Sequence, residues 1–202
     1  MTLWYIARAA GVMALLALTL TTALGAGGAS RPSRTQAAVA RRFALQRIHI
    51  AAAVTALGLL VTHLAALVLD THSGIAATAI VVPMAAAYRP IAVSLGVLAM
   101  YTVVVVALVG ATRGRVASSA WAARQWRGVH ALSYLGWAVA IAHGAFAGTD
   151  TLRGPMPLVY GGCVAVVASA AAARLWRESA RTRLPLPTGR RRIRESTAGP
   201  LS

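Results

Sequence analysis

Five long apolar stretches constrain the fold of this chain more than any other feature of its sequence. They cover residues 3–25, 46–69, 90–112, 126–148 and 155–176. Each has the roughly 20 residues that an α-helix needs to cross the ~30 Å hydrocarbon core of a bilayer. Because backbone polar groups in a bilayer must be satisfied internally, the sequence predicts an all-α, polytopic transmembrane helical bundle with five spanning helices.

Composition supports the same class of protein. Of the 202 residues, 58% are hydrophobic and only 12% are charged, which is typical of polytopic membrane proteins. The net charge of +16 would suit a nucleic-acid binder, but the arginines cluster between the apolar stretches. We therefore expect a lipid bilayer and no nucleic acid as partner. The single cysteine, Cys163, lies in an apolar run, which excludes a disulfide framework and a cysteine metal site.

A shorter apolar run covers residues 75–87 and is interrupted by Pro83. With about 13 residues it is too short to span a bilayer. The sequence predicts a short re-entrant or interfacial segment here.

The arginine distribution predicts the orientation. Five arginines lie in residues 31–47, four in 113–127 and eight in 174–194. The positive-inside rule places these segments in the cytoplasm of a bacterial cell, with the N-terminus outside and the C-terminus inside. We expect a membrane domain over 1–176 and a basic, disordered cytoplasmic tail over 177–202.

The first apolar stretch could instead be a cleaved signal peptide, because small residues follow it at 25–30. Cleavage would leave the arginines of residues 31–47 on the exported side. The charge bias therefore favours a retained first helix.

Four histidines lie inside the apolar stretches. His49 and His63 are 14 residues apart, and His130 and His143 are 13 apart. An intramembrane ionisable residue is costly and is by default functional. The second and fourth helices run in the same direction, each starting at arginine and ending at aspartate. Depth therefore matches His49 with His130 near the cytoplasm, and His63 with His143 nearer the exterior.

Paired imidazoles on facing helices favour haem iron, which takes two axial ligands. Zinc is usually coordinated by about four converging ligands, and pairs separated by roughly 20 Å cannot supply them. The alternative is that the histidines are hydrogen-bonded packing residues. With two haem b groups, cations near the propionates are expected from Arg47, Arg124 and Arg127 at the inner site and from Arg89 at the outer one.

Helical phase supports the paired sites only in part. A 14-residue step nearly closes four turns, so His49 and His63 share a face. A 13-residue step leaves His143 roughly 140° from His130 on an ideal helix. A bend, a π-bulge or an offset haem must make up the difference, and Gly136 marks a plausible place.

Over residues 3–176 the sequence resembles the ferric reductase-like transmembrane domain. That family includes ferric reductases, the membrane part of NADPH oxidases and the haem subunit of bacterial methionine sulfoxide reductase systems. The resemblance is carried by the 14- and 13-residue histidine spacings and by segments 3–8, 88–90 and 143–150. It implies two b-type haems that carry single electrons across the membrane.

Two departures from that family pattern matter. Only 26 residues follow the last apolar stretch, and they contain no Gly-rich nucleotide loop. The electron donor is therefore expected to be a separate cytoplasmic flavoprotein reductase or membrane quinol. Several relatives place an aromatic residue between the haems where this chain has Gly136. The adjacent Trp137 is a candidate for the inter-haem path, with packing as the alternative.

Weaker patterns lie at the helix ends. His72 could bind a ferric substrate or a metal, and Asp70 and Asp150 could position an exterior acceptor. In each case a solvated or boundary residue is the simpler interpretation. The basic tail could bind anionic lipid or an acidic flavoprotein, and it could equally anchor the topology.

The sequence thus predicts an oxidoreductase electron-transfer subunit without its own flavin domain. Its exterior acceptor would be ferric iron or an exported oxidoreductase, with oxygen least favoured. The competing hypothesis is a non-redox transporter or assembly factor with structural intramembrane histidines.

Overall fold

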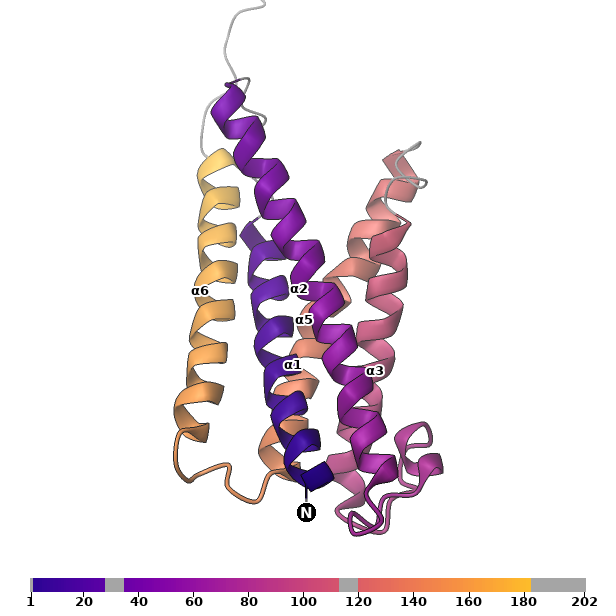
Figure 1. The fold of residues 1–202 in the computed structure, drawn as a ribbon. Helices are drawn as coiled ribbons and strands as arrows, with labels where there is room; N and C mark the ends of the chain where they lie inside the picture. Colours follow the sequence, from indigo (N-terminus) through magenta and orange to yellow (C-terminus); the bar gives the residue numbers. More distant parts are fainter. Residues whose placement is uncertain (1, 28–34, 113–119, 183–202) are drawn as a thin grey trace, which may run out of the picture.

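The structure is a computed structural model that describes residues 2–27, 35–112 and 120–182. Its elements are α1 (Thr2–Gly27), α2 (Gln36–Leu69), the 3-10 helix η1 (Ala77–Ile80), α3 (Pro90–Ala111), α5 (Ala120–Ala147) and α6 (Met156–Thr182) (Figure 1). These ranges contain helices and no strands, and five of the helices are long and apolar enough to cross a membrane. The predicted all-α bundle of five spans is confirmed, and the chain is an integral membrane protein.

Several helices extend beyond the apolar stretches that predict them. Helix α2 has 34 residues, about 50 Å at 1.5 Å per residue, against a hydrocarbon core of ~30 Å. Its first turns are rich in alanine and arginine. Both residues favour helix, but the arginines lower the mean hydropathy, so the apolar stretch in the sequence begins later than the helix. Helix α6 similarly continues to Thr182, past the predicted boundary at 176. The remainder of the predicted tail, 183–202, lies outside the described residues.

The helices form two antiparallel hairpins. Helix α1 packs along α2, and α3 packs along α5, whereas α2 and α3 touch only slightly. Helix α6 lies against α1, at the outer edge of the bundle (Figure 1). Helix α1 is therefore central, because it also contacts α5.

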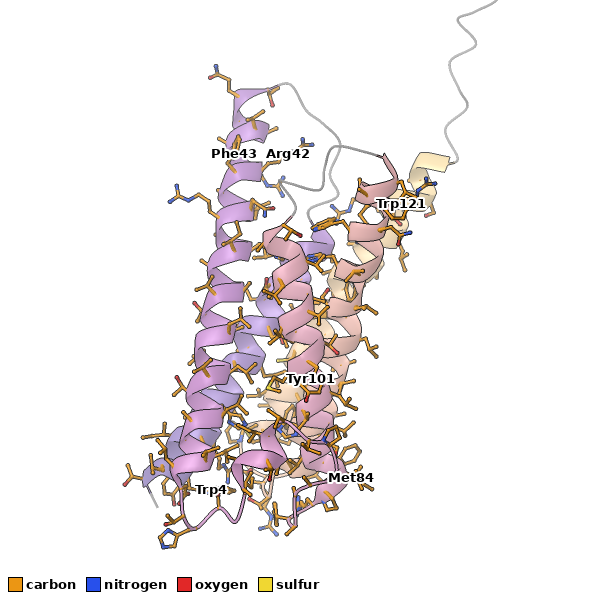
Figure 2. All side chains as sticks on the ribbon, turned by 90° about the vertical axis from the view of Figure 1, so that its right-hand side faces the viewer. Trp4, Arg42, Phe43, Met84, Tyr101 and Trp121 are labelled. Carbon is orange, nitrogen blue, oxygen red and sulfur yellow. The ribbon has the colours of Figure 1, made fainter. Side chains whose placement is uncertain are left out.

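The buried positions are mostly small, and the bulky apolar side chains point outward. Ala7, Ala52 and Ala92 are among the many buried alanines, and within the described ranges no large side chain is fully buried. Small residues let helix backbones approach closely where lipid competes with apolar side chains. Exposed residues such as Val61 and Leu158 face outward, where lipid would surround the bundle. Figure 2 shows the side chains that cover the outside of the bundle.

The connection between α2 and α3, which contains the segment predicted as re-entrant or interfacial, does not cross the bundle. It stays at the end where α2 finishes and α3 begins (Figures 1 and 2). The backbone N–H of Met84 donates to Ser94 Oγ at 2.7 Å. The Tyr101 hydroxyl donates to the Val81 carbonyl. These two bonds hold the connection against α3.

Arg89 joins the start of α3 to the end of α5. Its backbone is left-handed, with φ of 42°, and Pro90 follows at the first helical position. Its guanidinium donates to the carbonyls of Phe146 at 2.7 Å and Gly148 at 3.2 Å. A cation there satisfies the carbonyls that a helix C-terminus leaves without partners.

Replacing Arg89 should therefore loosen the end of α5. We expect Arg89→Gln to lower the free energy of unfolding by about 1 kcal/mol, since the side chain is exposed and water partly replaces the lost bonds. Thermal unfolding in detergent would measure the change. Arg153→Gln, in the exposed α5–α6 turn, is the matched control, and equal melting temperatures for the two variants would contradict the capping role.

Candidate functional site

The four intramembrane histidines meet in two pairs between the hairpins. The rings of His49 on α2 and His130 on α5 have centroids 6.2 Å apart with planes at 60°. The rings of His63 and His143 lie 6.4 Å apart with planes at 79°. We call His49/His130 the arginine-end pair and His63/His143 the aspartate-end pair. These are the pairs that matching by depth predicts.

Backbone carbonyls of neighbouring helices orient three of the rings. His63 Nδ1 lies 2.7 Å from the Ala7 carbonyl, and His143 Nδ1 lies 2.7 Å from the Ala92 carbonyl. His49 Nδ1 lies 2.9 Å from the Thr21 carbonyl. A carbonyl can only accept, so each Nδ1 carries the proton.

In a neutral ring this leaves the Nε2 lone pair free. Such a hydrogen bond is the usual partner of an imidazole that binds a metal through its other nitrogen.

The ring spacing fits two imidazoles on one metal ion. With metal–nitrogen bonds of about 2 Å, two opposed imidazoles place their centroids about 6.3 Å apart. Both measured separations, 6.2 and 6.4 Å, agree with this value. Across the part of the chain that the structure describes, groups of three or more metal-ligating side chains do not occur. The donor set of each site is thus two imidazoles, which suits haem iron.

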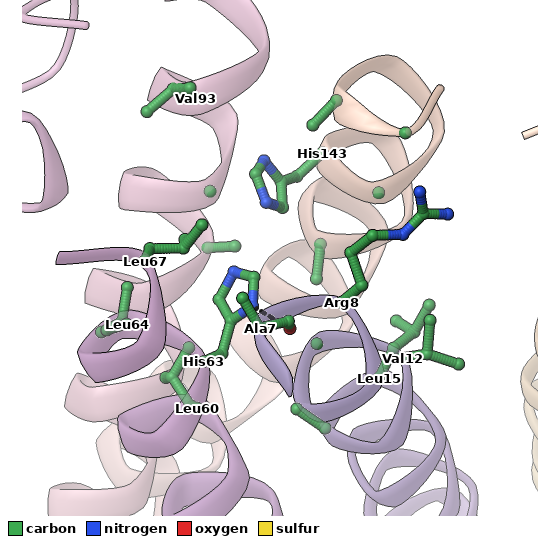
Figure 3. Close-up of a pocket in the computed structure, with 18 of the residues that line it drawn as sticks. Ala7, Arg8, Val12, Leu15, Leu60, His63, Leu64, Leu67, Val93 and His143 are labelled. Atoms are coloured by element: carbon green, nitrogen blue, oxygen red, sulfur yellow. Dashed lines mark hydrogen bonds between the residues drawn. The ribbon is translucent and has the colours of Figure 1, made fainter. Parts of the chain in front are cut away.

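A cavity of 590 Å³ surrounds the aspartate-end pair. This volume lies in the range of roughly 300–1,000 Å³ that cofactor pockets occupy. In Figure 3, His63 and His143 come from opposite walls and Arg8 lies at one side. Apolar residues of α1, α2, α3 and α5 form most of the wall, including Gly11 and Gly96. The site is therefore a largely apolar space that an apolar macrocycle could fill.

The mouth of this cavity is polar. Arg8 on α1 forms an ion pair with Asp150 and donates to Thr149 Oγ1 at 3.3 Å. Asp70, which is 5% exposed, also lines the cavity and accepts a bond from the His72 backbone N–H at 3.1 Å. The His72 side chain itself is 83% exposed. Charged groups thus gather where α1, α2 and α5 reach the same end of the bundle.

The arginines are distributed differently from the expected propionate contacts. Arg8 lines the cavity, whereas Arg89 is not among the lining residues and caps α5 instead. Sequence reasoning missed Arg8, although it is the only charged residue in the first apolar stretch. The arginines expected at the arginine-end pair are exposed near it, and their propionate contacts stay a prediction: Arg47, Arg124 and Arg127.

Two tryptophans on α5 lie close in sequence to its histidines. Trp137, between His130 and His143 in sequence, donates from Nε1 to Thr19 Oγ1 at 3.0 Å. It thereby bridges α5 and α1 midway between the pairs, and its role in an inter-haem path stays a prediction. Trp126 stacks on His130, with centroids 4.8 Å apart and planes at 13°. The i,i+4 spacing of these two rings could have predicted that stack.

Helix α5 reaches both partners without a π-bulge. It is α-helical from Ala120 to Ala147. A Cβ added at Gly136 would meet Thr102 Cγ2 at 2.9 Å, so this glycine allows close packing on α3. Helix α5 packs along α3 over most of its length, from the contact of His130 with Gly110 to that of His143 with Gly96. The 13-residue step is therefore accommodated within a continuous α-helix.

Fold and site together define a membrane protein with five spanning helices and two pairs of histidines, in which the two rings of each pair lie close together. A family model described as a domain of unknown function (DUF8596) matches residues 2–150, and the chain belongs to this family. The match contains all four histidines and ends before α6. No curated protein matches the chain, and no solved structure does.

The bridge between Trp137 and α1 gives a direct test of the packing. Thr19 is 5% exposed, and its hydroxyl accepts from Trp137 while donating to the Leu15 carbonyl at 2.8 Å. Thr19→Val would leave the indole N–H without its acceptor, and we expect a loss of about 1 kcal/mol in unfolding free energy. Thermal unfolding followed by tryptophan fluorescence would measure it.

The control for this test is Thr62→Val. Thr62 makes the same kind of bond to its own helix, to the Gly58 carbonyl at 3.0 Å, but is exposed. If the two variants have the same melting temperature, the hydrogen bond between Trp137 and Thr19 contributes nothing to stability.

Proposed function

We propose that this protein is a membrane-embedded, di-haem b-type cytochrome subunit that passes single electrons from the cytoplasmic side to an exterior acceptor. The observation that supports this most directly is the pair of opposed imidazoles, present twice. Their spacings of 6.2 and 6.4 Å match two ligands on one iron. In His49, His63 and His143 the Nδ1 hydrogen bond leaves Nε2 as the nitrogen that can bind a metal.

Each pair has a distinct role in this proposal. His49 and His130 hold the inner haem, and His63 and His143 hold the outer one. Bound haem supplies a reversible one-electron carrier at each level. The chain's own residues orient the imidazoles, exclude water with an apolar wall, and place Trp137 between the levels.

The resemblance to ferric reductase-like transmembrane domains supports the same assignment. The arginine-rich helix ends at α2, α5 and α6 favour a cytoplasmic location for that end in a bacterial membrane. A flavoprotein reductase or membrane quinol would then donate electrons to the inner site. Ferric iron or an exported oxidoreductase would accept them near the cavity mouth formed by Arg8 and Asp150.

Haem content and its dependence on single histidines test the proposal. The purified protein should contain two haems per chain with a low-spin, bis-imidazole spectrum that dithionite reduces. His63→Ala should remove the outer haem and spare the inner one, and His49→Ala should do the reverse. A colourless, stably folded protein from haem-replete cells would overturn the proposal and favour a transporter or assembly factor.

Arg8 and Arg89 can be separated by their effects on haem. We expect Arg8→Gln to weaken outer-haem binding by roughly 10-fold, since groups around a metal site typically contribute 10- to 100-fold to affinity. Arg89→Gln should leave the haem content unchanged, because that side chain caps α5. Haem titration of the apoprotein would measure both. Loss of haem from the Arg89 variant alone would show that the propionate contact belongs to Arg89.

A further inference from the structure

Each of the four histidines packs against a glycine of the neighbouring helix. A Cβ built on Gly11 would lie 3.0 Å from the His63 ring, and one on Gly96 would lie 2.7 Å from the His143 ring. At the other pair the corresponding distances are 3.5 Å for Gly25 and His49, and 3.6 Å for Gly110 and His130. Helices α1 and α3 thus each present two glycines, and in both helices these are 14 residues apart.

The hydrogen bonds of the histidine rings have a fixed spacing from these glycines. His63 bonds the carbonyl of Ala7, four residues before Gly11. His143 bonds that of Ala92, four before Gly96, and His49 bonds that of Thr21, four before Gly25. One local arrangement therefore recurs three times on two different helices.

The geometry of an α-helix explains why a glycine suits this position. The carbonyl of residue i−4 accepts the N–H of residue i, and the side chain of residue i leans over that turn. With no side chain at residue i, the carbonyl's second lone pair is open to a donor from another helix. An imidazole can then lie over the glycine and donate its Nδ1–H to that carbonyl.

We propose that Gly11 and Gly96 are positioning residues that seat the His63 and His143 imidazoles, with Nε2 directed between the hairpins. We call these positions the glycine seats. Ligation of haem by the seated rings rests on the proposed function. The seating itself is a property of the protein without haem.

The glycines next to the arginine-end pair are not such seats, and this difference makes the proposal specific. At Gly11 and Gly96 an added methyl group would be too close to the ring, so the imidazole must shift away from its carbonyl. At Gly25 and Gly110 the same methyl group would make ordinary van der Waals contact. Alanine should therefore disturb the aspartate-end pair and be tolerated at the arginine-end pair.

Gly96→Ala and Gly110→Ala, both on α3, form the central comparison. Gly96→Ala should lower the affinity for the outer haem by roughly 10- to 100-fold, the usual effect of losing a partner of a metal-binding histidine. Gly110→Ala should keep both haems. Gly128→Ala is the control, because nothing lies within 4 Å of its added Cβ. Retention of both haems with unchanged spectra in Gly96→Ala would overturn the proposal, as would equal losses in Gly96→Ala and Gly110→Ala.

A second measurement reports on the seats without haem. In the ¹⁵N-histidine-labelled apoprotein, His143 should carry its proton on Nδ1, and Gly96→Ala should remove that signature while leaving His49 unchanged. If the wild-type protein binds no haem, the proposed function fails and this measurement still decides the seating. If haem binds and the His143 tautomer is the same in both proteins, the seating is wrong.

A double-substitution cycle guards against a general folding defect. Gly96→Ala should lower the melting temperature when His143 is present, even though alanine favours helix over glycine. In the His143→Ala background the added methyl group meets no ring, so the same change should not lower it. A decrease of equal size in both backgrounds would show that the glycine serves α3 itself and would refute the seating.

Discussion

The hydrogen bond between a ring Nδ1–H and a backbone carbonyl of a neighbouring helix is the interaction on which the rest of this structure depends. Inside a bilayer an imidazole has no water to bond, so it needs a fixed partner. Carbonyls of α1 and α3 supply that partner to rings from α2 and α5. The bonds therefore join the helices within each hairpin and decide which nitrogen faces the space between the hairpins.

Small residues make this arrangement possible at both levels. Alanines let the two helices of each hairpin approach closely, and glycines admit the rings where they must cross a helix surface. Bulky side chains are left to face lipid. The space between the hairpins consequently stays open at the aspartate-end pair, where the cavity extends to the polar mouth formed by Arg8 and Asp150.

The two histidine pairs have similar ring separations but different surroundings. The aspartate-end pair has tight glycines, short carbonyl bonds and a large cavity. The arginine-end pair has looser glycines and a tryptophan, Trp126, stacked on His130. In the proposed cytochrome, hydrogen bonding and burial would tune the imidazole ligands, so the two sites would differ in redox potential.

The sequence by itself determined the all-helical membrane fold and the matching of histidines by depth. The length of each apolar stretch and the placement of the arginines can be compared directly with the thickness and the two sides of a bilayer. The sequence could not show that Arg8 rather than Arg89 lines the cavity, or that glycines on α1 and α3 seat the rings. It also left open whether α5 needs a π-bulge for the 13-residue step. Only the tertiary structure decided these points, because they depend on which helix surfaces meet and at what angle, and periodicity along one helix carries no information about its neighbours.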